Sequence, residues 1–295
     1  MGPVTSAIDA PTRGAGRGAY GLRITGISAD DMLVPADRLW PHLRVAVTIA
    51  ATDSALTDEA VTEERADLRL QTGGRLEVHR AAGLARFVVP RRLTDDEVVH
   101  PFLAPAAAVM AHWLNRPCFH SGGFVSAGGV WGLVGDRESG KSTTLAWLAL
   151  QGHSIVADDI LVLDPEGRAY AGPRSIDLRR GTAEHLGVGE ALGRVGARSR
   201  WRMTLKPLNL ELPFRGWFFL AWGERIEVVR LRGSESLARL LQQRTLRVRP
   251  SDPAAFLDLA ALPAWEIRRP RDWALLEAAS TCLIETSNST TEMRP

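Results

Sequence analysis

The chain has 295 residues, enough for one large domain or two small ones, and its 45% apolar and 24% charged residues are typical of a globular protein. A net charge of +2 without a long basic tract argues against nucleic acid or a membrane surface as a partner. Cys118 and Cys282 make no disulfide framework, and the N-terminus lacks the apolar segment of a secretory signal. We therefore expect a cytoplasmic protein.

The first part of the chain has a β-like pattern. Residues 1–18 are rich in small residues and predict a flexible arm, whereas 19–115 predict a β-rich subdomain that ends in a helix. Thr72-Gly73-Gly74 indicates a hairpin between strands at 67–71 and 75–80, and a third strand is expected at 85–89. These strands predict an antiparallel layer. Residues 101–114 then predict a helix with proline in its first turn.

From residue 116 to 286 the pattern changes to alternating strands and helices, which indicates an α/β domain. Residues 287–295 predict a flexible tail. Strands are expected at 118–125, 130–134, 154–157, 160–163, 217–221 and 226–231, and helices at 140–150, 236–243 and 272–283.

A complete P-loop motif stands between the predicted strand 130–134 and the helix that follows it. Its residues, with the next threonine, are Gly135, Asp136, Arg137, Glu138, Ser139, Gly140, Lys141, Ser142 and Thr143. The glycines let backbone N–H groups surround phosphate oxygens, and the helix N-terminus adds a positive dipole end. Lys141 would reach the β- and γ-phosphates of ATP, and the Ser142 hydroxyl would bind Mg²⁺. Lys141 and Lys206 are the only lysines of the chain, so a lysine in this position by chance is improbable.

Two adjacent carboxylates follow the next predicted strand. A helix of about 11 residues rises roughly 16 Å, and a return strand of about five residues covers a similar distance. Asp158 and Asp159 are therefore expected beside the P-loop, at the carboxyl end of their strand. One can take the proton of an attacking hydroxyl while the other holds Mg²⁺.

Three segments together resemble the catalytic domain of the HPr kinase/phosphorylase family. They are His120-Ser121-Gly122-Gly123-Phe124-Val125, Gly132 to Ser142, and Gly152-His153-Ser154-Ile155-Val156-Ala157-Asp158-Asp159. The spacings from His120 to Lys141 and from Lys141 to Asp158 are those of the family. The resemblance implies a P-loop kinase core of the HPr kinase/PEP carboxykinase-like type, preceded here by the antiparallel β-rich subdomain.

The resemblance also implies roles for single residues. Asp158 resembles the family's catalytic aspartate, which activates the target serine, and His120 resembles the histidine that tunes it. Asp159 resembles the neighbour near the metal. The nearest counterpart of the family's metal-binding Glu-x-Arg-Gly element contains Asp177 and Arg179. Arg137 and Glu138 depart from the family, which has small residues at these positions.

The implied function is an ATP- and Mg²⁺-dependent serine kinase that acts on a peptide or small protein, with homo-oligomers as in the family. The β-rich front half and the run His100 to Pro105 resemble a subgroup that phosphorylates ribosomally made peptide precursors, including lasso-peptide precursors. Two alternatives stay open: a small-molecule kinase on the same frame, and an ATP-binding regulator without catalysis.

A basic stretch lies outside these motifs. Arg198, Arg200, Arg202 and Lys206 surround Trp201 and Met203. Arginine favours phosphates and acidic peptides, so this stretch is a candidate substrate loop, and a solvated face is the competing interpretation.

Overall fold

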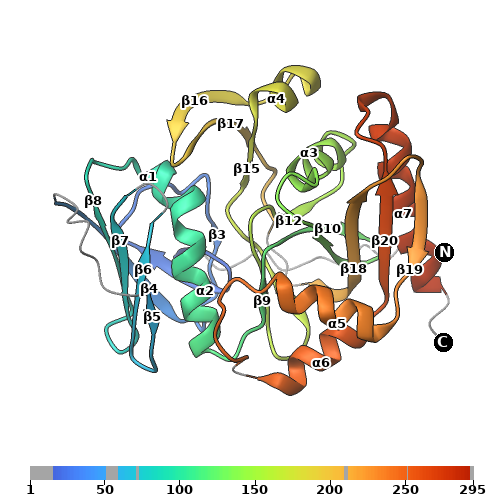
Figure 1. Cartoon of the computed structure of the whole chain (residues 1–295). Helices are drawn as coiled ribbons and strands as arrows, with labels where there is room; N and C mark the ends of the chain where they lie inside the picture. The colour runs from blue at the N-terminus through green and yellow to red at the C-terminus, as the bar shows by residue number, and fades with distance from the viewer. Residues whose placement is uncertain (1–15, 51–58, 71–72, 209–211, 251, 293–295) are drawn as a thin grey trace, which may run out of the picture.

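The computed structural model describes residues 16–50, 59–70, 73–208, 212–250 and 252–292. They form three sheets (Figure 1). The N-terminal sheet and its helix lie at the left of the view, and the central sheet with its flanking helices lies at the right. Within this described part, none of the helices combines the length and the apolar character needed to cross a membrane.

The N-terminal sheet has the strand order β3-β1-β2-β4-β8-β7-β6-β5. The strands are β1 (Arg17–Ala19), β2 (Leu22–Thr25), β3 (Val34–Pro35), β4 (His42–Ile49), β5 (Ala60–Val61), β6 (Arg65–Arg69), β7 (Arg75–His79) and β8 (Leu84–Val89). The predicted hairpin is confirmed, because β6 and β7 pair antiparallel with Leu68 opposite Leu76. The predicted third strand is β8, which pairs with β7.

The expectation of a purely antiparallel layer is wrong. Strand β4 pairs in parallel with both β2 and β8. The chain reaches β4 from β2 through residues 26–41, and it reaches β8 from β4 through strands β5 to β7. Connections of this length allow parallel neighbours, which a tight hairpin does not.

Helix α2 (Leu103–Trp113) follows the N-terminal sheet and packs against it. It is preceded by α1 (Asp95–Glu97) and a π-helical turn, Val98–Phe102. A capping box starts this segment: Thr94 Oγ1 accepts from the Glu97 N–H, and the Glu97 carboxylate accepts from the Thr94 N–H. The predicted helix at 101–114 is thus confirmed with a start two residues later. The turn before it carries His100 towards the central sheet.

The central sheet has the path β12-β10-β11-β18-β14-β13-β9, with β20 on β18 and β19 on β20. The strands are β9 (Cys118–Phe119), β10 (Ser121–Ser126), β11 (Gly129–Val134), β12 (Ile155–Ala157), β13 (Leu161–Leu163), β14 (Arg168–Tyr170), β18 (Leu212–Trp222), β19 (Glu227–Arg230) and β20 (Ala264–Arg269). Strands β11, β18 and β20 are parallel neighbours. Because β10 is antiparallel to both β11 and β12, these two also run in the same direction.

Helices cover both faces of this sheet, and strand alternation explains why. In β18, Trp217 and Phe219 pack on the side of α5 (Gly233–Gln242) and α6 (Pro253–Ala261). Phe218 and Leu220 pack on the other side with α3 (Lys141–Leu150) and α7 (Leu276–Glu292). Side chains of a strand point alternately to the two faces, so an apolar run fills both layers. The sequence expectation of a core strand here is confirmed.

A three-stranded sheet, which was not expected from the sequence, joins the two halves. Its order is β15-β17-β16, with β15 (Ser175–Leu178), β16 (Glu190–Val195) and β17 (Arg198–Thr204), and α4 (Arg180–Leu186) follows β15. Figure 1 shows β16 and β17 reaching over the top towards α1. The basic stretch 198–206 is therefore mostly a strand rather than a loop.

Both predicted flexible ends differ from the structure. In the arm 1–18, residues 1–15 lie outside the described residues, but Arg17 and Gly18 belong to β1. In the tail 287–295, helix α7 continues to Glu292. Ser287 is buried and its hydroxyl donates to Ser126 Oγ at 2.6 Å, while Thr290 and Thr291 hydroxyls donate to carbonyls four residues back. The bond from Ser287 to Ser126 ties this Ser/Thr-rich segment to β10, and the segment is helical in spite of its low helix propensity.

Candidate active site

The P-loop connects the end of β11 to the start of α3, as predicted. Gly140 has a φ of +89°, which suits glycine, and a Cβ at Gly135 would lie only 2.4 Å from Ser139 Oγ. The Lys141 ammonium is buried and donates to the carbonyls of Gly135 and Asp136 within the same loop. Burial lowers the pKa of Lys141, and the charge of Asp158 works in the opposite direction.

Asp158 and Asp159 follow β12 at the same sheet edge. Strands β11 and β12 run in the same direction, so the P-loop and the aspartate pair emerge at their common carboxyl end. Both aspartates line one cavity together with His120, residues 136–143 and Asp177. The position expected from helix rise and strand length is therefore the observed one.

The two aspartates differ in pKa because their surroundings differ. Asp158 is 5% exposed, and its Oδ1 has no hydrogen-bond partner. Burial and the neighbouring charge of Asp159 raise the pKa of Asp158 to about 7. Burial also disfavours the charged form of Asp159, but the charge and hydrogen bond of His100, together with the charge of Arg200, outweigh burial and hold the pKa of Asp159 below its usual range.

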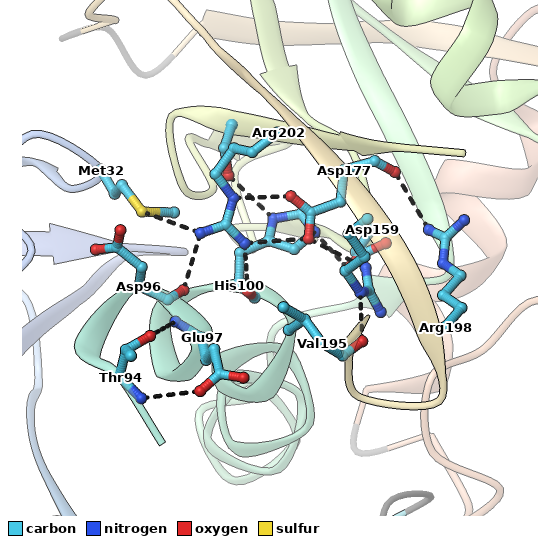
Figure 2. Close-up of polar contacts among 12 residues, drawn as sticks. Met32, Thr94, Asp96, Glu97, His100, Asp159, Asp177, Val195, Arg198 and Arg202 are labelled. Carbon is cyan, nitrogen blue, oxygen red and sulfur yellow. Dashed lines mark hydrogen bonds and ion pairs between the residues drawn. The ribbon is translucent and has the colours of Figure 1, made fainter. Parts of the chain in front are cut away.

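His100 is a site residue for which no role was expected from the sequence. It is 2% exposed and comes from the π-helical turn before α2. Its Nε2 lies 3.0 Å from Asp159 Oδ2, and its Nδ1 lies 3.3 Å from Ser175 Oγ (Figure 2). Burial alone would lower the pKa of His100, but the charges of Asp159 and Asp177 raise it. In the sequence, the run His100 to Pro105 indicated only a resemblance to a subgroup. No motif relates its position to that of the P-loop.

His120 lies at the wall of the same cavity, just before β10, and its backbone N–H donates to the Gln243 carbonyl at 2.6 Å. Burial and the charge of Lys141 lower the pKa of its imidazole. The histidine whose pKa is raised beside the aspartate pair is His100, and the tuning role expected for His120 stays a prediction.

The carboxylate of Asp177 is already paired and is not available to bind a metal ion. It is fully buried in β15, and Arg202 Nε donates to its Oδ1 at 2.8 Å while Arg202 and Arg200 both donate to Oδ2 (Figure 2). Two guanidinium groups already neutralise this carboxylate. The sequence expectation of Asp177 as a metal ligand is thus corrected to a buried ion-pair partner. Arg198, Arg200 and Arg202 are every second residue of β17, so their side chains point to the same face of the strand, towards Asp177.

One group of side chains has the arrangement of a metal site. His100, Asp158 and Asp159 each offer a ligand atom, and these atoms lie within 4.8 Å of one another. Asp159 was the expected metal neighbour. Ser142, the other expected ligand, interacts with Asp158 through its hydroxyl, which lowers the pKa of that carboxyl. The group is rich in oxygen and buried, so it suits a divalent cation.

The remaining cavity wall is basic and partly aromatic. Arg269 is buried and donates to the Ser139 carbonyl at 3.1 Å and to Thr144 Oγ1 at 3.0 Å, which fixes the P-loop against β20. Its guanidinium carbon lies 4.6 Å from the ring centre of Trp222, whose side chain is 42% exposed. Glu138, one of the departures from the family, pairs with Arg179 at 2.7 Å across exposed surface.

The cavity has a volume of about 1400 Å³. It runs from the P-loop towards the N-terminal sheet and α2. Its apolar lining residues at that end are Val61, Leu68, Leu70, Phe102 and Pro105. Small-molecule sites are typically about 300–1000 Å³. The hollow therefore exceeds what a nucleotide alone requires.

No known protein-family model matches this sequence, and no curated protein matches it. Among solved structures, the chain is similar to the HPr(Ser) kinase/phosphatase from Coxiella burnetii at a TM-score of 0.30 and 12% identity, over 58% of this chain and 97% of that chain. A similarity at this level carries no argument about function. Any function must therefore rest on the residues of the site themselves.

Proposed function

We propose that this chain is an ATP-dependent kinase that transfers the γ-phosphate to a serine hydroxyl of a peptide or small protein. One observation carries this proposal: a complete P-loop and a buried aspartate with a raised pKa meet at one sheet edge and line one cavity. A protein that only binds ATP needs the loop, but it needs no carboxyl whose pKa is raised into the range of a general base.

The P-loop residues supply binding and orientation. Backbone N–H groups of 135–140 and the N-terminus of α3 attract the phosphates, and Lys141 turns from the loop carbonyls to the β- and γ-phosphates. A divalent cation, when bound, neutralises charge on the phosphoryl oxygens.

Asp158 acts on the acceptor. Its carboxylate takes the proton of the serine hydroxyl, the serine oxygen forms a bond to the γ-phosphorus, and the bond to the bridging oxygen breaks so that ADP leaves with that electron pair. A pKa of about 7 is suited to a base that works near neutral pH. The positioning of the two reactants carries most of the rate.

The size and lining of the cavity favour a peptide acceptor over a metabolite. The space beyond the P-loop extends to apolar side chains of β5, β6 and α2. An extended peptide can place a serine at Asp158 while its neighbours contact these side chains. Within this class, the resemblance of the run His100 to Pro105 puts ribosomally made precursors, including lasso-peptide precursors, first.

The proposal is tested by separating binding from transfer. ATP binding is measured by calorimetry, and ADP formation is measured with and without serine peptides, for the wild type and Asp158→Asn. We expect the variant to retain ATP binding through the P-loop and to lose on the order of 10²- to 10⁴-fold in peptide-dependent ADP formation. Equal rates in both proteins would refute the role of Asp158. ATP binding without acceptor-dependent turnover on peptides or small alcohols would refute the kinase function.

A further inference from the structure

We propose that His100, Asp158 and Asp159 bind a divalent transition-metal ion through one nitrogen and two carboxylate oxygens, so that the site prefers Mn²⁺ over Mg²⁺. For the role of the ion this inference rests on the proposed kinase function. Metal binding itself is measured without nucleotide, so either proposal can fail alone.

The geometry matches a metal centre. The three ligand atoms lie within 4.8 Å of one another, and an ion about 2.1 Å from each ligand spans about 4 Å between opposite ligands. His100 and Asp158 are almost fully buried, and Asp159 keeps 29% of its side chain exposed towards the cavity. An ion and its remaining water or phosphate ligands therefore have an open side.

Two polar atoms in this group lack hydrogen-bond partners. Asp158 Oδ1 has none, and His100 Nε2 has only ion-pair contacts, with Asp159 Oδ2 at 3.0 Å and Asp177 Oδ2 at 3.7 Å. Buried polar atoms are hydrogen-bonded in the large majority of cases, so the unpartnered Asp158 Oδ1 needs an explanation. A cation held by Asp158 Oδ1 and His100 Nε2 supplies the missing partner.

The imidazole is oriented as metal-binding histidines are. Ser175 Oγ lies 3.3 Å from His100 Nδ1, and Arg202 Nη2 donates to the His100 carbonyl at 2.6 Å. A partner on Nδ1 directs Nε2 to the aspartates, in the way outer-shell groups fix a ligand's tautomer and ring. Figure 2 shows His100 beside Arg202, Asp159 and Asp177.

The ion pairs around the site leave Asp158 and Asp159 available to bind the ion. The third carboxylate, Asp177, is already matched by Arg200 and Arg202. Asp158 and Asp159 together can balance a divalent cation. Carboxylate oxygens suit Mn²⁺ as well as Mg²⁺, but imidazole nitrogen is a ligand of transition-metal ions, whereas Mg²⁺ prefers oxygen ligands in a strict octahedron. The histidine is therefore the residue that sets the metal preference.

The test is Mn²⁺ titration of the nucleotide-free full chain by electron paramagnetic resonance, with pulsed spectra to detect coupling to a histidine nitrogen. We expect one Mn²⁺ site with nitrogen coupling, displaced by Mg²⁺ only at about tenfold or higher concentration. His100→Gln should weaken Mn²⁺ binding at least about tenfold and abolish the coupling. His112→Gln, a histidine on the far part of α2, is the matched control and should change neither.

Ser175→Ala keeps all three ligands and loses only the partner of Nδ1. It should weaken Mn²⁺ binding about tenfold while keeping the nitrogen coupling, which guards against a folding defect in His100→Gln. Absence of a Mn²⁺ site, equal affinity for Mg²⁺, or unchanged coupling in His100→Gln would each overturn the inference. Phosphate transfer with Mg²⁺ in a protein without a Mn²⁺ site would overturn this inference and leave the kinase proposal standing.

Discussion

The Nε2 of His100 lies 3.0 Å from Oδ2 of Asp159, although one residue precedes the helix of the N-terminal half and the other follows a strand of the central sheet. This pair lowers the pKa of Asp159 while burial raises that of its neighbour Asp158. Adjacent carboxylates with pKa values pushed apart can divide acid–base and metal-binding work. The N-terminal half is thus part of the candidate active site.

Asp177→Asn should destabilise the fold by about 3–5 kcal/mol, because it leaves the buried guanidinium of Arg202 without a countercharge. Chemical denaturation measures this loss. Glu184→Gln removes an acid from an exposed ion pair with Arg180 and should change the free energy of unfolding by no more than about 0.5 kcal/mol. Equal effects of the two changes would contradict the buried ion-pair interpretation.

The carboxylate of Asp177 also predicts part of the loss of folding stability in acid. Although burial raises the pKa of Asp177, the charge of His100 and the hydrogen bond from Arg202 hold it below its usual range. The folded state therefore stays ionised where the unfolded chain takes up a proton, at about pH 4. The stabilisation is present above that pH and is lost as the pH falls through the folded pKa. Asp177→Asn should flatten the loss of stability in acid, and an unchanged slope would contradict this assignment.

Lys141→Ala should weaken ATP binding by about 1.5–3 kcal/mol, the value of a hydrogen bond to a charged group. Calorimetric titration gives the affinity. Lys206→Ala, at the only other lysine, is exposed and supplies the matched control with unchanged affinity. If both variants bind ATP like the wild type, the loop does not hold the phosphates.

Trp222 is placed to stack on the nucleotide base, because it lines the cavity beside Gly140 and is 42% exposed. Trp222→Ala should weaken ATP binding by about 1–3 kcal/mol and leave inorganic triphosphate binding unchanged. Trp222→Phe should restore most of the loss. An equal loss for ATP and triphosphate would place Trp222 at the phosphates or in folding rather than at the base.

The local features of the site were predictable because they depend on neighbours in the chain. The strand, the P-loop and α3 follow one another, and the return strand fixes where Asp158 emerges. The hairpin of β6 and β7 carries its own turn signal. Helix α6 was not predicted, although the sequence carries a signal for it, with Asp252 as its cap and Pro253 at the first position.

The tertiary partners could not be predicted in the same way. His100 reaches Asp159, and Arg202 reaches Asp177, only through the way the N-terminal half and the three-stranded sheet pack on the central sheet. The expectation of Asp177 as a metal ligand failed because a carboxylate in isolation does not reveal which arginines fold onto it. The end of α7 was missed because Ser and Thr have low helix propensity, whereas Ser287 finds its partner in β10.

Transfer of label from γ-³²P-ATP to a panel of serine peptides, including any precursor encoded beside this gene, tests the central claim most directly. The wild type is compared with Asp158→Asn in the presence of Mg²⁺ and of Mn²⁺. We predict label on a serine of at least one peptide with the wild type and none with the variant. Bound ATP with no label on any peptide or small alcohol would contradict the claim and leave a nucleotide-binding regulator.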